Sequence, residues 1–240
     1  MTYITKTNRK WVGCGLGLML AACLVATAWA SGRTVVDARV SYRQMQRMAD
    51  NAAKGSDFPI TVNEAVLKEL NAFLGTPKGR AYLAKAMANL ELQRGIFDRQ
   101  LAEHRIPEEL LAVGLIESAY ANPPASANPK SRAAGVWQFI PATARTFGLR
   151  VDENVDERLD VEKETDAAFR YLESNKLRFN DWLLGVMSYN MGERSLAAAI
   201  ETTGTRDAWK LVELGFEGDA RYLAKFMAAL LILKNPEVLK

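Results

Sequence analysis

The chain has 240 residues, 49% of them hydrophobic, which is enough for one well-filled domain with accessory helices. Its 31 basic and 28 acidic side chains give a net charge of +3, but three basic residues and no acid precede position 31. Residues 31–240 therefore have no net charge, and they give no electrostatic case for nucleic-acid binding. Both cysteines, Cys14 and Cys23, also precede position 31, and His104 is the only histidine. Residues 31–240 therefore lack the parts of a disulfide, a catalytic thiolate and a zinc site with Cys or His ligands, and we expect neither a metal nor a cofactor.

Residues 1–30 have the pattern of a leader. Positive side chains precede position 11, residues 11–30 carry no charge, and Ala28-Trp29-Ala30 has the small-x-small form of a signal-peptidase site. Two other interpretations stay open. Leu20-Ala-Ala-Cys23 has the form of a lipobox, in which Cys23 would be lipidated, and the uncharged run is long enough to remain as an uncleaved membrane anchor. All three export the rest of the chain, so we expect a periplasmic protein, which lipidation or an anchor would attach to a membrane.

Residues 31–58 are polar with sparse apolar positions, and they predict a stalk or linker with at most a loose helix. Beyond them the apolar spacing is helical and strand signals are almost absent, so the chain is predicted to be all-α. Residues 122–130 contain three prolines, which exclude a long helix. The last apolar run, residues 219–234, is predicted to be a core helix, because it is too short and too closely flanked by charges to span a membrane.

The helix ends have local signals. Thr61-Val-Asn-Glu64 has the form of a capping box, and Gly75 ends the helix that it opens. Thr76-Pro77 begins a second helix that extends to about His104, and Pro107 begins a third. Further helical patterns begin at positions 141, 161, 181 and 195.

Glu117 is the most informative residue. It ends an apolar, helix-like run, and the next carboxylate in the chain is Asp152. The residues from Ser118 to Arg150 supply aromatics, amides and cations instead. Because such surroundings disfavour the ionised form of a carboxyl group, they keep a proton available near neutral pH. Glu117 is therefore the candidate general acid.

Three segments carry the polar residues of interest: Glu117-Ser118-Ala-Tyr120, Gly135-Val-Trp-Gln138, and Met187-Ser-Tyr-Asn190 followed by Met191-Gly192. In order and spacing they resemble the three motifs of the family 1 lytic transglycosylases, whose usual forms are Glu-Ser, Gly-Leu-Met/Trp-Gln and Ala-Tyr-Asn-Ala-Gly. The resemblance covers roughly residues 59–200 and is nearest to the membrane-bound type D members. The departures from the usual residues remove no polar catalytic group; they are Val136, Ser188 and Met191.

The resemblance implies an all-α, lysozyme-like fold of the goose-type (SLT) class. We expect an N-terminal helical extension at residues 59–104, the catalytic domain at residues 105–200, and C-terminal helices at residues 201–240 that pack on it. Type D members usually carry C-terminal LysM wall-binding modules, and we expect none here.

Glycosidases normally use two carboxylates, whereas the stretch after Glu117 offers none. The resemblance implies a single-acid route on peptidoglycan. Glu117 protonates the oxygen between MurNAc and GlcNAc and then accepts the proton of the MurNAc C6 hydroxyl, which closes on C1 as a 1,6-anhydro ring. Two alternatives stay open: hydrolysis as a muramidase, with Asp152, Asp156 or Asp160 as the second acid, or a wall-binding module without catalysis.

The resemblance also assigns supporting residues. Tyr189 would bond to Glu117 and Ser118 would act beside it, with a core aromatic and a turn-stiffening hydroxyl as the structural alternatives. Gln138 suits an N-acetyl group, because its amide both donates and accepts. The remaining candidates are sugar contacts at Trp137, Tyr120 and Asn190, with packing as the alternative for Trp137 and a structural amide as the alternative for Asn190, and tight backbone geometry at Gly135 and Gly192. Expected partners are glycan strands and, through the leader, a membrane; a secretion or other envelope complex is left open.

Overall fold

The described part of the chain is built from helices. A computed structural model describes residues 39–218 and 221–240, so the predicted leader, its cleavage site and Cys23 lie outside the described residues. Within this part the strand-like pairings are two isolated bridges, Ala134 to Phe139 and Val151 to Asp156. The all-α prediction is confirmed for this part of the chain. None of its helices is long and apolar enough to cross a membrane.

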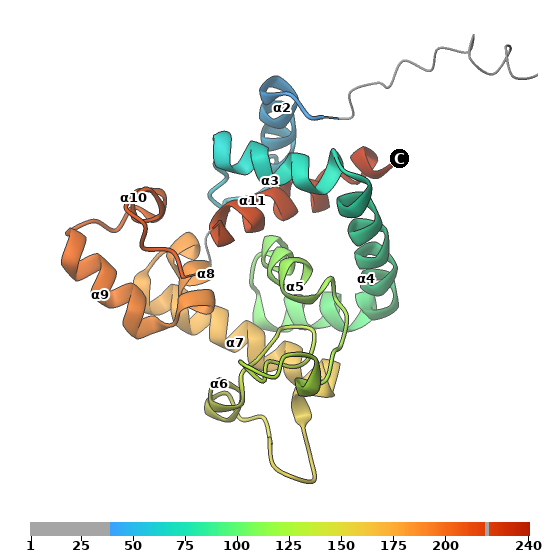
Figure 1. Cartoon of the computed structure of the whole chain (residues 1–240), viewed down its shortest axis with the longest axis vertical. Helices are drawn as coiled ribbons and strands as arrows, with labels where there is room; N and C mark the ends of the chain where they lie inside the picture. Colours follow the sequence, from blue (N-terminus) through green and yellow to red (C-terminus); the bar gives the residue numbers. More distant parts are fainter. Residues whose placement is uncertain (1–38, 219–220) are drawn as a thin grey trace, which may run out of the picture. The chain divides into compact units, whose positions relative to one another are not determined.

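The α-helices follow one another in the order drawn in Figure 1: α2 (Tyr42–Ala52), α3 (Glu64–Leu74), α4 (Pro77–His104), α5 (Leu111–Ser118), α6 (Pro141–Thr146), α7 (Val161–Phe179), α8 (Trp182–Met191), α9 (Glu193–Thr203), α10 (Ala208–Glu213) and α11 (Tyr222–Leu233). Short 3-10 turns lie between or after them: η1 (Glu108–Leu110), η2 (Ala125–Ala127), η3 (Glu157–Leu159) and η4 (Pro236–Leu239). The proline-rich stretch holds only η2, as its prolines predict.

Most helix ends follow the local signals. Thr76 caps α4 and Gly75 closes α3, as predicted, and α7 and α8 begin at or next to the expected positions 161 and 181. The start of α3 differs. Its cap is Asn63, whose side chain accepts a hydrogen bond from the Val66 amide, and the capping box predicted from Thr61-Val-Asn-Glu64 does not form. Either side chain can cap a helix, so the sequence alone did not decide between them.

The centre of the fold is α11, as the apolar composition of its residues predicts. Ten of its 12 residues are buried, and it packs against α2, α3, α5 and α8. In Figure 1 it runs beside α3, with α5 on its other side. Since α5 carries Glu117, α11 reaches the first motif directly.

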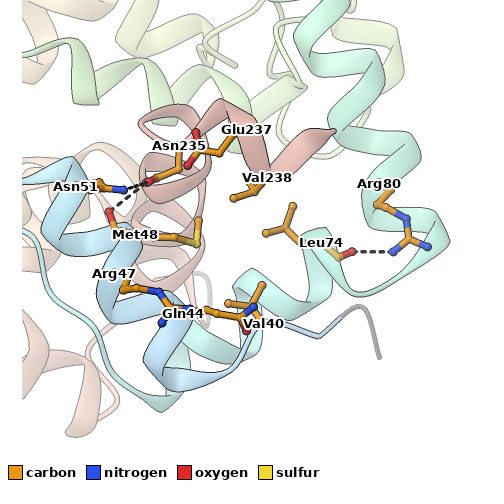
Figure 2. A pocket seen from close by; sticks show the side chains of 10 residues that line it. All are labelled: Val40, Gln44, Arg47, Met48, Asn51, Leu74, Arg80, Asn235, Glu237 and Val238. Carbon is orange, nitrogen blue, oxygen red and sulfur yellow. Dashed lines mark hydrogen bonds between the residues drawn. The ribbon is translucent and has the colours of Figure 1, made fainter. Parts of the chain in front are cut away.

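The predicted stalk at residues 31–58 is wrong for α2. This helix turns Met45, Met48 and Ala52 inward and packs on α3 and α11. Figure 2 shows the groove of about 500 Å³ that α2 forms with the corner between α3 and α4 and with η4. Beside the groove, the Asn51 amide donates to the side-chain oxygen of Asn235 at 3.3 Å. Three buried apolar side chains on one face dock the helix, although most of its other positions are polar.

The site is positioned by two helix ends and the segment between them. The first motif closes α5 at Ser118, and the third closes α8 at Met191. Ala119 and Tyr120 adopt left-handed backbone angles, with φ of 56° and 53°, which turns the chain sharply away from α5. The segment that follows carries the second motif and lies against α7, whose Glu164 bonds to it.

Candidate active site

Glu117 lies half-buried in the last turn of α5 and lines a groove of about 420 Å³. The other lining residues come from the second and third motifs, α6, α7 and neighbouring loop: Ser131, Ala133, Gln138, Phe139, Ile140, Thr143, Tyr171, Tyr189, Asn190, Met191 and Gly192. Among the described residues that line this groove, Glu117 is the only carboxylate. The structure thus brings the three motifs together around one acid.

One hydrogen-bond partner of Glu117 is Tyr222, which the sequence analysis did not identify. Its hydroxyl donates to Glu117 Oε1 at 2.7 Å. Tyr222 is buried at the first residue of α11, and burial, followed by the charge of Glu117, raises the pKa of Tyr222 well above its ordinary value. The hydroxyl therefore keeps its proton and acts as a donor at neutral pH. The available signal was a tyrosine at the start of a mostly apolar run, because a buried hydroxyl needs a partner.

The second motif forms a turn that residues of the other two motifs hold. Ser118 Oγ donates to the carbonyl of Val136, and the Tyr189 hydroxyl donates to the carbonyl of Trp137, both at 2.7 Å. Tyr189 was expected to donate to Glu117, but its single proton goes to Trp137 instead. It still lies near the acid, since the charge of Glu117, after burial, contributes to raising the pKa of Tyr189. The main contact of the Tyr189 hydroxyl is therefore with the turn of the second motif, which forms part of the groove wall.

A buried acid holds the same turn from the other side. Glu164 of α7 is fully buried and accepts hydrogen bonds from the backbone amides of Val136 at 2.9 Å and Trp137 at 2.8 Å. Burial raises the pKa of Glu164 well above its usual value, and the two amides oppose that rise. Gly135 has φ of +83°, and a Cβ there would lie 2.0 Å from Glu164 Oε1. The same Cβ would lie 2.1 Å from the carbonyl oxygen of Arg158, so two close neighbours explain the special geometry predicted at Gly135.

Arg158 bonds to residues on both sides of the second motif. It is buried, pairs with Asp156 at 2.7 Å, and donates from Nη1 to the carbonyls of Arg132 at 2.6 Å and Phe139 at 2.8 Å. The hydrogen bond from Arg158 holds the pKa of Asp156 below its usual value. Sequence reasoning missed both Arg158 and Glu164, because their importance depends on contacts with residues about twenty or more positions away.

The three acids considered for a hydrolytic route are all engaged elsewhere. Asp156 pairs with Arg158, Asp152 accepts from Arg150 Nε at 2.5 Å, and Asp160 caps α7. None of the three lines the groove. The described residues also contain no group of three or more His, Cys, Asp or Glu side chains that could hold a metal ion.

Two of the predicted sugar contacts, Trp137 and Tyr120, are wrong. Both side chains are 0% exposed. Trp137 donates from Nε1 to Thr165 Oγ1 at 3.0 Å, and its ring packs edge-on against Phe169. The Tyr120 hydroxyl donates to the carbonyl of Leu111 at 2.9 Å. Both rings belong to the core, so the packing alternative holds for Trp137, and neither ring can stack on a sugar in the groove.

Gln138, Asn190 and Gly192 do line the groove. Gln138 Nε2 donates to the carbonyl of Gly135 at 2.6 Å, and its Oε1 accepts from Asn128 Nδ2 at 2.9 Å, so the amide orientation is fixed. Asn190 lies in the last turn of α8, and Gly192 follows that helix with φ of +84°. A Cβ on Gly192 would meet no atom within 4 Å, so the left-handed backbone, and not lack of space, favours glycine there.

Residues 95–212 match the family model of the transglycosylase SLT domain. Over 181 residues the chain is 34% identical to the membrane-bound lytic murein transglycosylase D of Escherichia coli K12, a match that covers 73% of this chain and 38% of that relative. The protein of the same name from Escherichia coli O6:H1 matches equally. A putative tributyltin chloride resistance protein of Alteromonas sp. strain M-1 is 34% identical over 102 residues, which are 42% of this chain and 48% of that relative.

The chain spans less than half of the length of these curated relatives. The matched residues 95–212 include Glu117 and all three motifs, whereas α3 and Tyr222 lie outside them. The predicted lysozyme-like helical fold agrees with the helices described above and with this match. The chain therefore belongs to the proteins that carry a transglycosylase SLT domain.

Proposed function

We propose that this chain is a peptidoglycan lytic transglycosylase that cleaves the β-1,4 bond between MurNAc and GlcNAc and leaves 1,6-anhydroMurNAc ends. The observation that carries the proposal is the isolation of Glu117, the only carboxylate among the described residues that line the groove. Two-carboxylate glycoside hydrolysis needs a second acid as base or nucleophile. A groove with one acid suits a reaction in which the substrate supplies the nucleophile.

In the proposed reaction Glu117 acts first as an acid. It transfers its proton to the glycosidic oxygen while the bond from that oxygen to C1 of MurNAc breaks. The Tyr222 hydroxyl, 2.7 Å from Oε1, stabilises the carboxylate that forms. Glu117 then accepts the proton of the C6 hydroxyl as that oxygen bonds to C1. The proton returns to the enzyme, and no water is consumed.

The walls of the groove suit an uncharged sugar. Gln138 and Asn190 supply amides, Tyr189 and Tyr171 lie with their ring centroids 4.9 Å apart, and Ile140 is 44% exposed. Amides can bond to an N-acetyl group, and aromatic and aliphatic faces can contact sugar rings. We assign Gln138 and Asn190 to substrate binding, and Tyr189 and Ser118 to supporting the turn beside Glu117.

An envelope location accompanies this function. The Escherichia coli relative is named as membrane-bound, and residues 1–30 have the pattern of an export leader. We propose that the domain acts on the periplasmic side of a membrane. Peptidoglycan strands are the proposed partner.

The test is a digest of purified sacculi with wild-type protein and with Glu117→Gln. The Gln variant keeps the shape of the side chain but has no transferable proton, so product release should fall by at least ~10²-fold. Wild-type products should end in anhydroMurNAc. Reducing ends would establish the muramidase alternative, and absence of release with retained sacculus binding would establish the wall-binding module. A thermal melt of both proteins shows that any loss is not due to unfolding.

A further inference from the structure

The first turn of α11 has a strained entry. Its N-terminal cap is Arg221, a residue other than glycine with φ of +77°. A left-handed backbone is unfavourable for such a residue and persists only where its surroundings impose it. Tyr222, the next residue, bears the hydroxyl that bonds to Glu117. Arg221 thus directly precedes the residue whose hydroxyl bonds to the acid.

Two carboxylates bond to Arg221, whose side chain is 52% exposed. Glu217 accepts from the backbone amides of Arg221 at 2.7 Å and Leu223 at 2.6 Å, which caps the helix. Glu69 of α3 accepts from Arg221 Nη1 at 2.7 Å. Glu69 is only 4% exposed, and a buried carboxylate is unfavourable unless it is paired. The ion pair therefore fixes Arg221 between a buried partner on α3 and the cap of α11.

The contacts form a continuous series from the N-terminal helices to the acid. Glu69 pairs with Arg221, Arg221 precedes Tyr222, and Tyr222 bonds to Glu117. We propose that Glu69 is a positioning residue, which acts through Arg221 to keep the Tyr222 hydroxyl on Glu117. This inference rests on the proposed function. It makes α3, which lies outside the matched residues 95–212, a working part of the active site.

A second ion pair on α11 provides a matched control. Glu109 is also 4% exposed, and it pairs with Lys234, just after the other end of α11, at 3.2 Å. It accepts a further hydrogen bond from Ser56 at 2.6 Å. The pair lies beyond the end of α11 opposite to Tyr222, and Lys234 also bonds to Glu108 at 2.6 Å. A general contribution of buried ion pairs to folding would therefore appear in both Glu69→Gln and Glu109→Gln.

The experiment compares the two variants for thermal stability and for kcat and KM on sacculi across a range of pH. Both should melt at a lower temperature than wild type. We expect only Glu69→Gln to lower kcat, by about fivefold, with KM nearly unchanged, because the affected group acts on the acid and not on substrate binding. The alkaline limb of its pH–kcat profile should move to higher pH, since a carboxylate that loses a donor keeps its proton longer.

A double-mutant cycle shows whether Glu69 acts through Tyr222. In a Tyr222→Phe background, Glu69→Gln should lower kcat no further, because the hydroxyl that it positions is already gone. Losses that multiply, or a kcat for Glu69→Gln equal to that of Glu109→Gln, would overturn the proposal.

A readout without catalysis separates this proposal from the proposed function. In protein labelled with 3-fluorotyrosine, the Tyr222 fluorine resonance is identified by its loss in Tyr222→Phe. It should shift in Glu69→Gln and not in Glu109→Gln, even if wild-type protein releases no anhydro product. An unshifted resonance in Glu69→Gln would refute the positioning role, whatever the reaction proves to be.

Discussion

Tyr222→Phe removes one oxygen atom from the candidate active site and leaves the ring in place. The hydroxyl donates to Glu117 Oε1 at 2.7 Å, and the ring is only 4% exposed. Phenylalanine fits the same space, so the variant should fold. What changes is the stabilisation of the charge that appears on Glu117 when the acid gives up its proton.

The size of the effect follows from the difference between two hydrogen bonds. A bond to a neutral acceptor contributes about 1 kcal/mol and one to a charged acceptor about 1.5–3 kcal/mol. Only the gain of about 0.5–2 kcal/mol on charging lowers the barrier, and each 1.36 kcal/mol is tenfold in rate, so kcat should fall by about 2- to 30-fold. The alkaline limb of the pH–kcat profile should move to higher pH, because the ionised carboxylate has lost a donor.

The assay is release of muropeptides from sacculi as a function of pH, with a thermal melt for each protein. Tyr120→Phe is the control. It removes another buried hydroxyl, which bonds to the Leu111 carbonyl at 2.9 Å and does not line the groove, and should cost about 1 kcal/mol of stability with unchanged kcat. The reasoning is refuted if Tyr222→Phe turns over like wild type with an unmoved pH profile, or if the Tyr120 control loses as much activity.

Three further outcomes are expected. Gly135→Ala places a Cβ 2.0 Å from Glu164 Oε1 at φ of +83° and should lower the free energy of unfolding by about 3 kcal/mol or more. The control Gly204→Ala has φ of +68° and open space, so it should lower the free energy of unfolding by only about 1–2 kcal/mol. Denaturant titrations measure both values. Asp156 has a lowered pKa through Arg158, so its contribution to stability is present above its unfolded pKa and is lost as pH falls below about 4; Asp156→Asn should be less stable at neutral pH and should show a flatter stability–pH curve in acid. Tyr189→Phe loses the bond to the Trp137 carbonyl and should cost about 1 kcal/mol of stability and lower kcat, and unchanged kcat with a large loss of stability would leave Tyr189 only a packing role.

The parts of the fold that local chemistry determines were predictable from the sequence. Thr76 and Gly75 mark helix ends because capping and helix termination depend on a few adjacent residues. The burial of α11 follows from its composition. The docking of α2 was not predictable in this way. It depends on Met45 and Met48 meeting a helix that lies about 180 residues further along the chain.

In the candidate site, too, the residues identified by local motifs were predictable and those that act through distant contacts were not. The sequence identified Glu117 and the three motifs, which the structure brings to one groove. It missed Tyr222, Glu164 and Arg158, because each acts through a partner from a distant segment. It placed Trp137 in the groove because an aromatic ring can either pack or stack on a sugar, and only burial decides between the two.

The most direct test of the central claim is a digest of sacculi in water enriched in oxygen-18, with the new glycan ends analysed by mass spectrometry. If Glu117 works alone and the MurNAc C6 hydroxyl closes on C1, every new MurNAc end is an anhydro ring that carries no heavy oxygen and is one water lighter than a reducing end. Heavy oxygen at C1 of the released MurNAc would show that water is the nucleophile and would contradict the single-acid account.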